Sequence, residues 1–226
     1  MKHISLFAIV AFFFIPTSFA SAHQPYLIYG EKQISVDQPE ISKAYYGEFN
    51  GSPVVFTIKS DKDFKLYAGV LVPTIAGSDE DVMAVITYND KQIALLNKPA
   101  PEWTRMYEPF GGDNYFQGPE WRGNATSGVY TITVSRPGNI GKYVLAVGET
   151  ESFTFDETLR TIRILPALKS EFFGEPAWTA YFNRIGLFMV LGFLAIVIIL
   201  LIFGEILKMI ARIVRRIFGI SKPVRD

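Results

Sequence analysis

The sequence predicts a mainly β protein: an exported antiparallel β-sandwich or jelly roll, followed by short helices and one C-terminal transmembrane helix. Two observations predict the sandwich. Short runs alternate apolar with polar residues, and turn residues separate these runs at regular spacing. An uncharged apolar run near the C-terminus predicts the membrane span.

Residues 1–22 are typical of a secretory signal peptide. A single basic residue precedes the apolar stretch Ile4–Ile15, and small residues follow it. Ala20 and Ala22 both fit the small-x-small rule for cleavage, and an uncleaved N-terminal anchor is a third option. Cleavage after Ala22 would make His23 the first residue of the mature chain.

The predicted exported domain, residues 23–155, contains seven runs with the length and composition of strands. They are Ser42–Phe49, Val54–Lys59, Phe64–Val72, Val82–Tyr88, Gln92–Leu96, Gly128–Ser135 and Lys142–Val147. Asn50-Gly51 lies between the first two runs and predicts a β-hairpin. From Phe64 to Val72 every second residue is apolar, which predicts one buried face.

A helical neck is expected at residues 156–184, beneath the sandwich. The sequence there favours one or two short helices, interrupted where Pro166 lacks the backbone N–H that a helix needs.

The span is predicted at Ile185–Phe203, a run without charge that would be about 28 Å long as a helix. Residues 204–226 follow with six basic and two acidic residues, so the positive-inside rule places the C-terminus in the cytoplasm. Apolar residues recur there at helical spacing, which indicates an amphipathic basic helix on the inner leaflet. A plain stop-transfer flank is the alternative.

Composition excludes several classes of function. The formal net charge is zero, which argues against nucleic-acid binding. This zero is a sum of two unlike regions. Residues 23–184 contain 15 basic and 20 acidic residues, whereas the tail that follows is basic. The absence of Cys excludes disulfides and thiolate chemistry, and two His residues supply zinc sites and Ser-His-Asp triads poorly. No catalytic motif stands out, so we expect a protein that is not an enzyme.

The segment Gly128–Glu149 resembles the closing hairpin of bacterial pre-peptidase C-terminal-type domains. The residues that carry the resemblance are Gly128, Tyr130, Gly141, Tyr143 and Leu145. Residues 49–70 are similar to the family's earlier hairpin. The resemblance covers about half of the exported domain and implies a small jelly-roll accessory domain. It is a family that includes collagen- and sugar-binding modules, some of them stabilised by calcium. It carries no functional residue over to this chain.

The strongest candidate for a binding site is Pro99–Trp121, which we expect to be a long loop rich in aromatic, Gly and Pro residues. Trp and Tyr rings stack on sugars, and hydroxyl groups would bind the interleaved acids, with Asn114 or Gln117. These acids are Glu102, Glu108, Asp113 and Glu120. The candidate ligand-binding residues are Trp103, Tyr107, Glu108, Asp113, Asn114, Tyr115 and Trp121. The alternative is that these aromatic residues only plug one end of the sandwich.

No cofactor is firmly expected, but two metals are candidates. Calcium would use carboxylates of the acidic turn, above all Asp79 and Asp81, or the Glu108/Asp113 pair. Copper would use the α-amine and imidazole of His23 after cleavage at Ala22, with help from a Met, Tyr or carboxylate. The alternative to the calcium site is a solvated acidic turn without metal. The alternative to the copper site is that His23 follows the cleavage site by coincidence.

The sequence therefore predicts a non-enzymatic, single-pass surface protein whose exported sandwich binds a glycan or protein ligand. A copper- or calcium-binding envelope protein and a structural subunit of a membrane complex are the alternatives.

Overall fold

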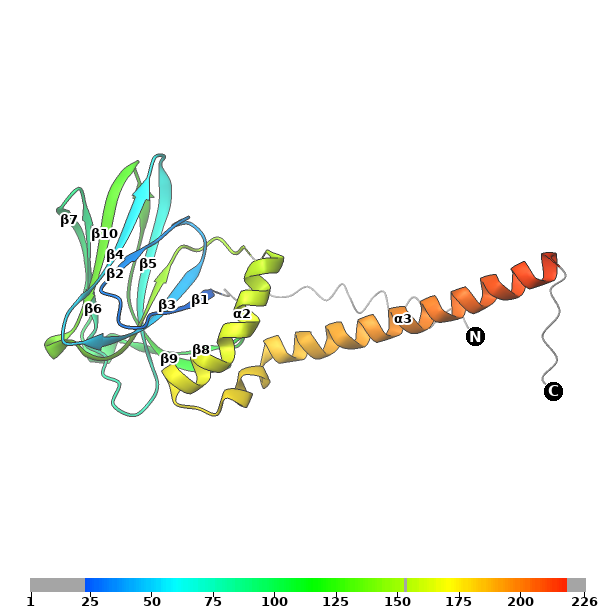
Figure 1. Ribbon diagram of the computed structural model, residues 1–226. Coiled ribbons are helices and arrows are strands. Elements are labelled where there is room, and N and C mark those ends of the chain that lie inside the picture. Colours follow the sequence, from blue (N-terminus) through cyan, green and yellow to red (C-terminus); the bar gives the residue numbers. More distant parts are fainter. Residues whose placement is uncertain (1–22, 153, 219–226) are drawn as a thin grey trace.

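The computed structural model describes residues 23–152 and 154–218, and the predicted signal peptide lies outside the described residues. Two β-sheets pack face to face, short helices cover part of one outer face, and a long helix leaves the body (Figure 1). The predicted fold class, a β-sandwich followed by helices, is confirmed.

The larger sheet has six strands in the order β1-β3-β11-β5-β9-β8. Their bounds are Gln24–Leu27 (β1), Lys43–Asn50 (β3), Ile140–Val147 (β11), Phe64–Pro73 (β5), Asp113–Ala125 (β9) and Thr104–Glu108 (β8). The smaller sheet has five strands in the order β2-β4-β10-β6-β7. Their bounds are Gln33–Ser35 (β2), Val54–Ser60 (β4), Gly128–Ser135 (β10), Met83–Tyr88 (β6) and Lys91–Leu96 (β7).

Both sheets are mixed, because β1 runs parallel to β3 and β2 runs parallel to β4. The remaining strand pairs are antiparallel, as predicted.

The hairpin predicted at Asn50-Gly51 is wrong. Gly51 does adopt a positive φ of 83°, but the turn carries the chain from β3 in one sheet to β4 in the other. The Gly128–Glu149 segment likewise places β10 and β11 in different sheets. In a β-sandwich, a tight turn can connect two strands of the same sheet, as a hairpin, or two strands of different sheets, as an arch.

The core lies between the two sheets and follows the predicted alternation. Phe64, Leu66, Ala68, Val70 and Val72 of β5 are all buried there. Facing strands contribute further aromatic and aliphatic side chains, so the sandwich has one continuous core.

The neck covers part of the outer face of the six-stranded sheet. It comprises α2 (Phe155–Ala167), the π-helical turn η3 (Leu168–Phe173) and the 3₁₀ segment η4 (Ala177–Tyr181). Its buried side chains form a second core cluster with outward-facing residues of the sheet.

The sequence predicted a helix break at Pro166, but α2 continues through this residue. Pro166 removes the N–H that would bond the carbonyl of Ile162, and the Tyr181 hydroxyl donates to that oxygen instead, at 3.1 Å. The helix therefore continues and loosens into η3 only after Ala167.

The long helix α3 (Arg184–Ile217) begins directly after the neck and is exposed along nearly its whole length. It is the one helix among the described residues that is long and apolar enough to cross a membrane. The predicted span and the first part of the predicted basic tail thus form one continuous helix (Figure 1).

Candidate functional site

The stretch expected to be a loop is mostly a hairpin of the six-stranded sheet. Residues Thr104–Gln117 pair as β8 and β9 around a tight turn. The turn is held by Glu108, whose carboxylate accepts the backbone N–H groups of Phe110 and Gly111 at 2.7 and 2.6 Å. Burial raises the pKa of Glu108, and these two hydrogen bonds oppose the rise.

Three of the seven ligand-binding candidates are buried. Trp103 and Tyr115 belong to the two core clusters, and Asp113 forms a buried ion pair with Lys169 of the neck, with 2.5 Å between Oδ1 and Nζ. Glu108 is half-buried in the turn. Tyr107 and Asn114 are exposed and adjacent in the β8–β9 ladder.

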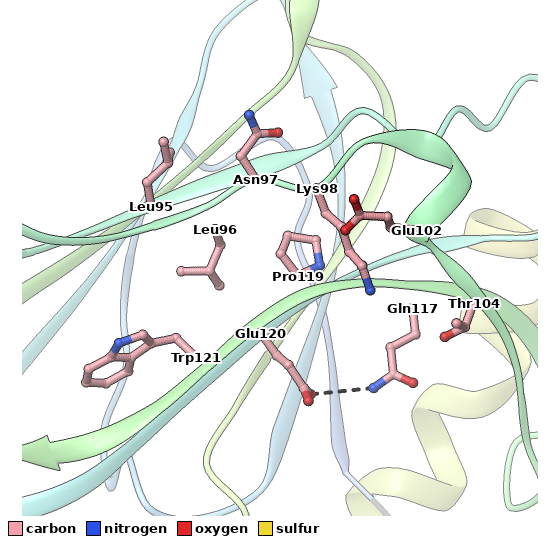
Figure 2. Close-up of a pocket in the computed structure, with 11 residues that line it drawn as sticks. Leu95, Leu96, Asn97, Lys98, Glu102, Thr104, Gln117, Pro119, Glu120 and Trp121 are labelled. Atoms are coloured by element: carbon pink, nitrogen blue, oxygen red, sulfur yellow. Dashed lines mark hydrogen bonds between the residues drawn. The ribbon is translucent and has the colours of Figure 1, made fainter.

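Of these seven residues, Trp121 lines the groove between the two sheets. This edge groove, of about 540 Å³, is lined by Leu95, Leu96, Asn97, Lys98, Glu102, Thr104, Gln117, Gly118, Pro119, Glu120 and Trp121 (Figure 2). Because β8 pairs with β9 only as far as Gln117, the rest of β9 is a sheet edge, and β7 is the edge of the facing sheet.

A β-bulge shapes the floor of the edge groove. Gly69 pairs with Glu120 and Leu71 with Gln117, so one residue of β5 faces two of β9, Gly118 and Pro119. A bulge tolerates proline, which cannot donate to the ladder. It also turns Gln117 and Glu120 to the same face, where the Gln117 amide donates to Glu120 at 3.5 Å (Figure 2).

Gly118 is required by Trp103 beneath it. A Cβ at position 118 would lie 2.4 Å from the Trp103 ring. The Trp103 Nε1–H donates to the carbonyl of Lys98 at 3.0 Å, which ties the wall of the groove to its floor. Trp103 therefore supports the groove from the core side.

Glu120 is the best-connected polar group of the groove. It accepts hydrogen bonds from the Arg122 guanidinium at 2.7 Å and from the Tyr67 hydroxyl at 3.1 Å. The hydrogen bond from Arg122 is the main reason why its pKa lies below the usual value. Glu120 and Trp121 are neighbours in β9, so their side chains leave opposite faces of the strand: the carboxylate meets the Gln117 amide on the outer face, and the Trp121 ring packs at the side of the core (Figure 2).

Sequence reasoning had named Trp121, Gln117, Glu120 and Glu102 in this region but missed the wall formed by Leu95–Lys98. That wall comes from β7 and the segment after it, which belong to the other sheet. No local signal connects the two segments, because the contact exists only once the sheets have packed.

His23 lies on the outer face of the six-stranded sheet, the face toward which Gln117 and Glu120 also point. Its Nδ1 is 2.6 Å from the Ser42 hydroxyl. Burial lowers its pKa to about 4, so the imidazole is neutral at neutral pH. A pocket of about 220 Å³ beside it is also lined by Tyr67, Met106 and Glu149, and it shares residues 117–120 with the edge groove.

The two carboxylates of the acidic turn, Asp79 and Asp81, form ion pairs with Arg136. Arg136 Nη2 contacts Asp79 Oδ2 at 2.8 Å, and Arg136 Nε lies 2.9 Å from Asp81 Oδ1. Across residues 23–152 and 154–218, no group of three or more His, Cys, Asp or Glu side chains is placed to hold a metal ion.

The chain matches no protein-family model and no curated protein. Its fold is similar to that of several solved structures. The pre-peptidase C-terminal domain of collagenase from Bacillus anthracis is 13% identical over 54% of this chain and 97% of that domain, with a TM-score of 0.33. The resemblance noted in the sequence is thus also found in the structure.

Two other solved structures show the same kind of likeness. CorA, a surface-associated copper-binding protein of Methylomicrobium album BG8, is 9% identical over 54% of this chain and 99% of its own, with a TM-score of 0.28. A β-glucosidase from Kluyveromyces marxianus is 19% identical over 51% of this chain, with a TM-score of 0.25, and this chain covers only 13% of its length. At these values the likeness concerns the fold alone.

Proposed function

We propose that the protein is a non-enzymatic, single-pass membrane protein whose exported sandwich binds a neutral glycan in the edge groove. The observation that carries the proposal is the groove itself, whose lining includes the Trp121 ring on one face of the free edge of β9 and the Gln117–Glu120 pair on the other. An aromatic ring suits the C–H face of a sugar, and fixed amide and carboxylate groups suit its hydroxyls. The volume lies within the usual range of about 300–1,000 Å³ for small-molecule sites.

Two features favour a neutral glycan. The predicted exported domain carries more acidic than basic residues, and the groove is lined by Glu102 and Glu120 against one basic residue, Lys98, which disfavours an anionic sugar. The free edge of β9 could pair with an extended peptide, but Pro119 removes one donor from it. Recognition by side chains is therefore favoured over strand addition.

The orientation in the membrane rests on the sequence. The basic residues after Phe203 and the predicted signal peptide both favour an extracytoplasmic sandwich. The helix α3 has the length and hydropathy of a span, which supports the anchoring.

A glycan array probed with the full-length protein in detergent tests the binding. Gln117→Ala and Trp121→Ala should both abolish the signal, while Tyr107→Ala, an exposed aromatic outside the groove, should keep it. A thermal melt must show that all three variants fold. Array binding that survives Gln117→Ala and Trp121→Ala in folded protein would refute the groove as the site. If no glycan binds but a protein co-purifies through α3, the structural-subunit alternative gains the support.

Copper handling at His23 is a second candidate, favoured by one observation. The pocket beside His23 contains the methionine, tyrosine and carboxylate that a single-histidine site would need, in Met106, Tyr67 and Glu149. The neutral imidazole is the form that binds metal. N-terminal sequencing of the mature protein should find His23 first, and titration with Cu(II) should show binding that His23→Ala removes. A mature chain that starts at Ser21 would exclude this candidate.

A further inference from the structure

Three large aromatic side chains stand exposed immediately before α3. Trp178 is 64% exposed, Tyr181 37% and Phe182 78%. We call these three residues the aromatic shelf. The segment Ala177–Phe182 that carries them contains no charged residue. A contiguous exposed aromatic surface of this kind marks a contact site.

The shelf is held in place from the side of the neck. Ala180, in the middle of the segment, is fully buried in the second core cluster. The Tyr181 hydroxyl is fixed on the carbonyl of Ile162. On the outer side, the Trp178 and Phe182 rings pack edge to face with 5.3 Å between their centroids. The Trp178 and Phe182 rings therefore point outward from a fixed backbone, while the half-exposed Tyr181 ring leans against the neck.

The start of α3 is also fixed on the sandwich. Asn183 caps the helix by accepting the Gly186 N–H at 3.1 Å, and its amide donates to the carbonyl of Gly111 at 2.9 Å. The Arg184 guanidinium lies 6.0 Å from the centroid of the Phe110 ring. The tip of the β8–β9 hairpin thus sits at the level where the helix leaves the body.

The level of the shelf relative to a bilayer follows from the sequence of α3. The uncharged run begins at Ile185, three residues after Phe182. The interfacial layer on each side of the hydrocarbon core is about 5–7 Å thick. If the run fills the hydrocarbon core, the shelf lies within this layer. Trp and Tyr prefer that layer because their rings are apolar and their N–H and O–H groups stay hydrated.

We propose that the aromatic shelf inserts into the interfacial layer of the membrane that α3 spans, on the exported side. The inference rests on the membrane anchoring in the proposed function. The bilayer, rather than a protein, is the occupant, because the shelf is uncharged and lies directly before the apolar helix α3. Contact through both α3 and the shelf holds the sandwich at one orientation on the membrane.

Tryptophan quenching by brominated lipids tests the proposal on the full-length protein in phosphatidylcholine vesicles. The protein has three tryptophans, and α3 contains none of them. Bromine placed near the headgroup end of the acyl chains should quench wild-type emission. Trp178→Phe should remove most of this quenching, while the control Trp121→Phe should leave it unchanged. Both substitutions keep an aromatic ring, so both variants should fold.

Alkaline carbonate extraction of the same vesicles separates the two ways to fail. If the protein is extracted, the anchoring fails and the shelf proposal fails with it. If it stays in the membrane but Trp178→Phe is quenched as much as wild type, only the shelf proposal is overturned. The shelf proposal is also overturned if the wild-type protein stays in the membrane but is not quenched. A protein partner would then be the expected occupant of the shelf.

Discussion

The buried ion pair between Asp113 and Lys169 should be the most sensitive link between the sandwich and the neck. Their side chains are only 2% and 3% exposed. The Lys169 ammonium also lies 3.4 Å from Glu175 and 5.3 Å from the centroid of the Phe173 ring. Lys169→Met removes the cation and leaves a buried carboxylate without its partner.

The expected cost of Lys169→Met is about 3–5 kcal/mol in the free energy of unfolding at pH 7, the usual effect of breaking a buried pair from one side. Asp113→Asn together with Lys169→Met leaves no buried charge and should recover most of that loss. The two residues should therefore show a coupling energy of up to about 3 kcal/mol in a double-mutant cycle.

The pair should also give stability a pH dependence. Burial raises the pKa of Asp113 to about 6, and the hydrogen bond from Lys169 opposes the rise. Between about pH 4 and pH 6 the folded state then holds a proton that the unfolded chain has lost. The free energy of unfolding should fall as pH rises through this window, by at most about 3 kcal/mol. Glu108 and Glu175 also act on this pair, so the slope must be assigned by comparison with Asp113→Asn.

Urea unfolding of the full-length protein in detergent micelles, followed by near-ultraviolet circular dichroism at pH 5 and pH 7, measures all of these effects. Asp113→Asn should flatten the slope between the two pH values. Lys169→Met should lose more stability at pH 7 than at pH 5, where the carboxyl is protonated. The reasoning is refuted if Lys169→Met stays within about 1 kcal/mol of wild type at pH 7, or if the double variant is no more stable than Lys169→Met.

Three further predictions use the same melt or unfolding assays. Gly118→Ala should cost about 1–3 kcal/mol, because its Cβ would meet the Trp103 ring, and an unchanged midpoint would contradict the packing beneath the groove. Asn183→Ala should cost about 1 kcal/mol through the lost helix cap, whereas Asn183→Asp should keep the cap and lose the amide's hydrogen bonds to the carbonyls of Gly111 and Ala180. Chelation by EDTA should leave the melting temperature unchanged, because Asp79 and Asp81 already bind a guanidinium; a fall would restore the calcium hypothesis.

The strands that the sequence predicted are those whose signal is local. β5 alternates along its whole length, and β6 and β7 flank a turn in which Asn89 and Asp90 both adopt positive φ. β9 was missed because Gly118 and Pro119 are typical of loops. The bulge that accommodates them lies in β9 itself, but it forms only where β9 pairs with β5, about fifty residues earlier in the sequence. A bulged strand that depends on so distant a partner cannot be predicted from its own residues.

The sequence pointed to the kinds of side chain that line the candidate site, but not to which residues line it. The sequence indicated that aromatic rings and carboxylates between Trp103 and Trp121 could bind a ligand. Within one strand, however, neighbouring side chains point to opposite faces. Tyr115 and Asp113 consequently face the neck and are buried there, while Trp121 packs at the side of the core and lines the groove. Which face is covered depends on where the neck docks, and the sequence of β9 does not contain that information.

The same strand connects the start of α3 to the groove. Asp113, at the first residue of β9, is bound to the neck, and the turn before it contacts Asn183 at the start of α3. Trp121 follows eight residues later, about 26 Å along the strand at the usual rise per residue. If α3 and the aromatic shelf fix the body on the membrane, β9 also fixes the place of the groove relative to it. A ligand attached to the cell envelope would then meet the groove at a constant position, which is the advantage of a short rigid neck over a flexible linker.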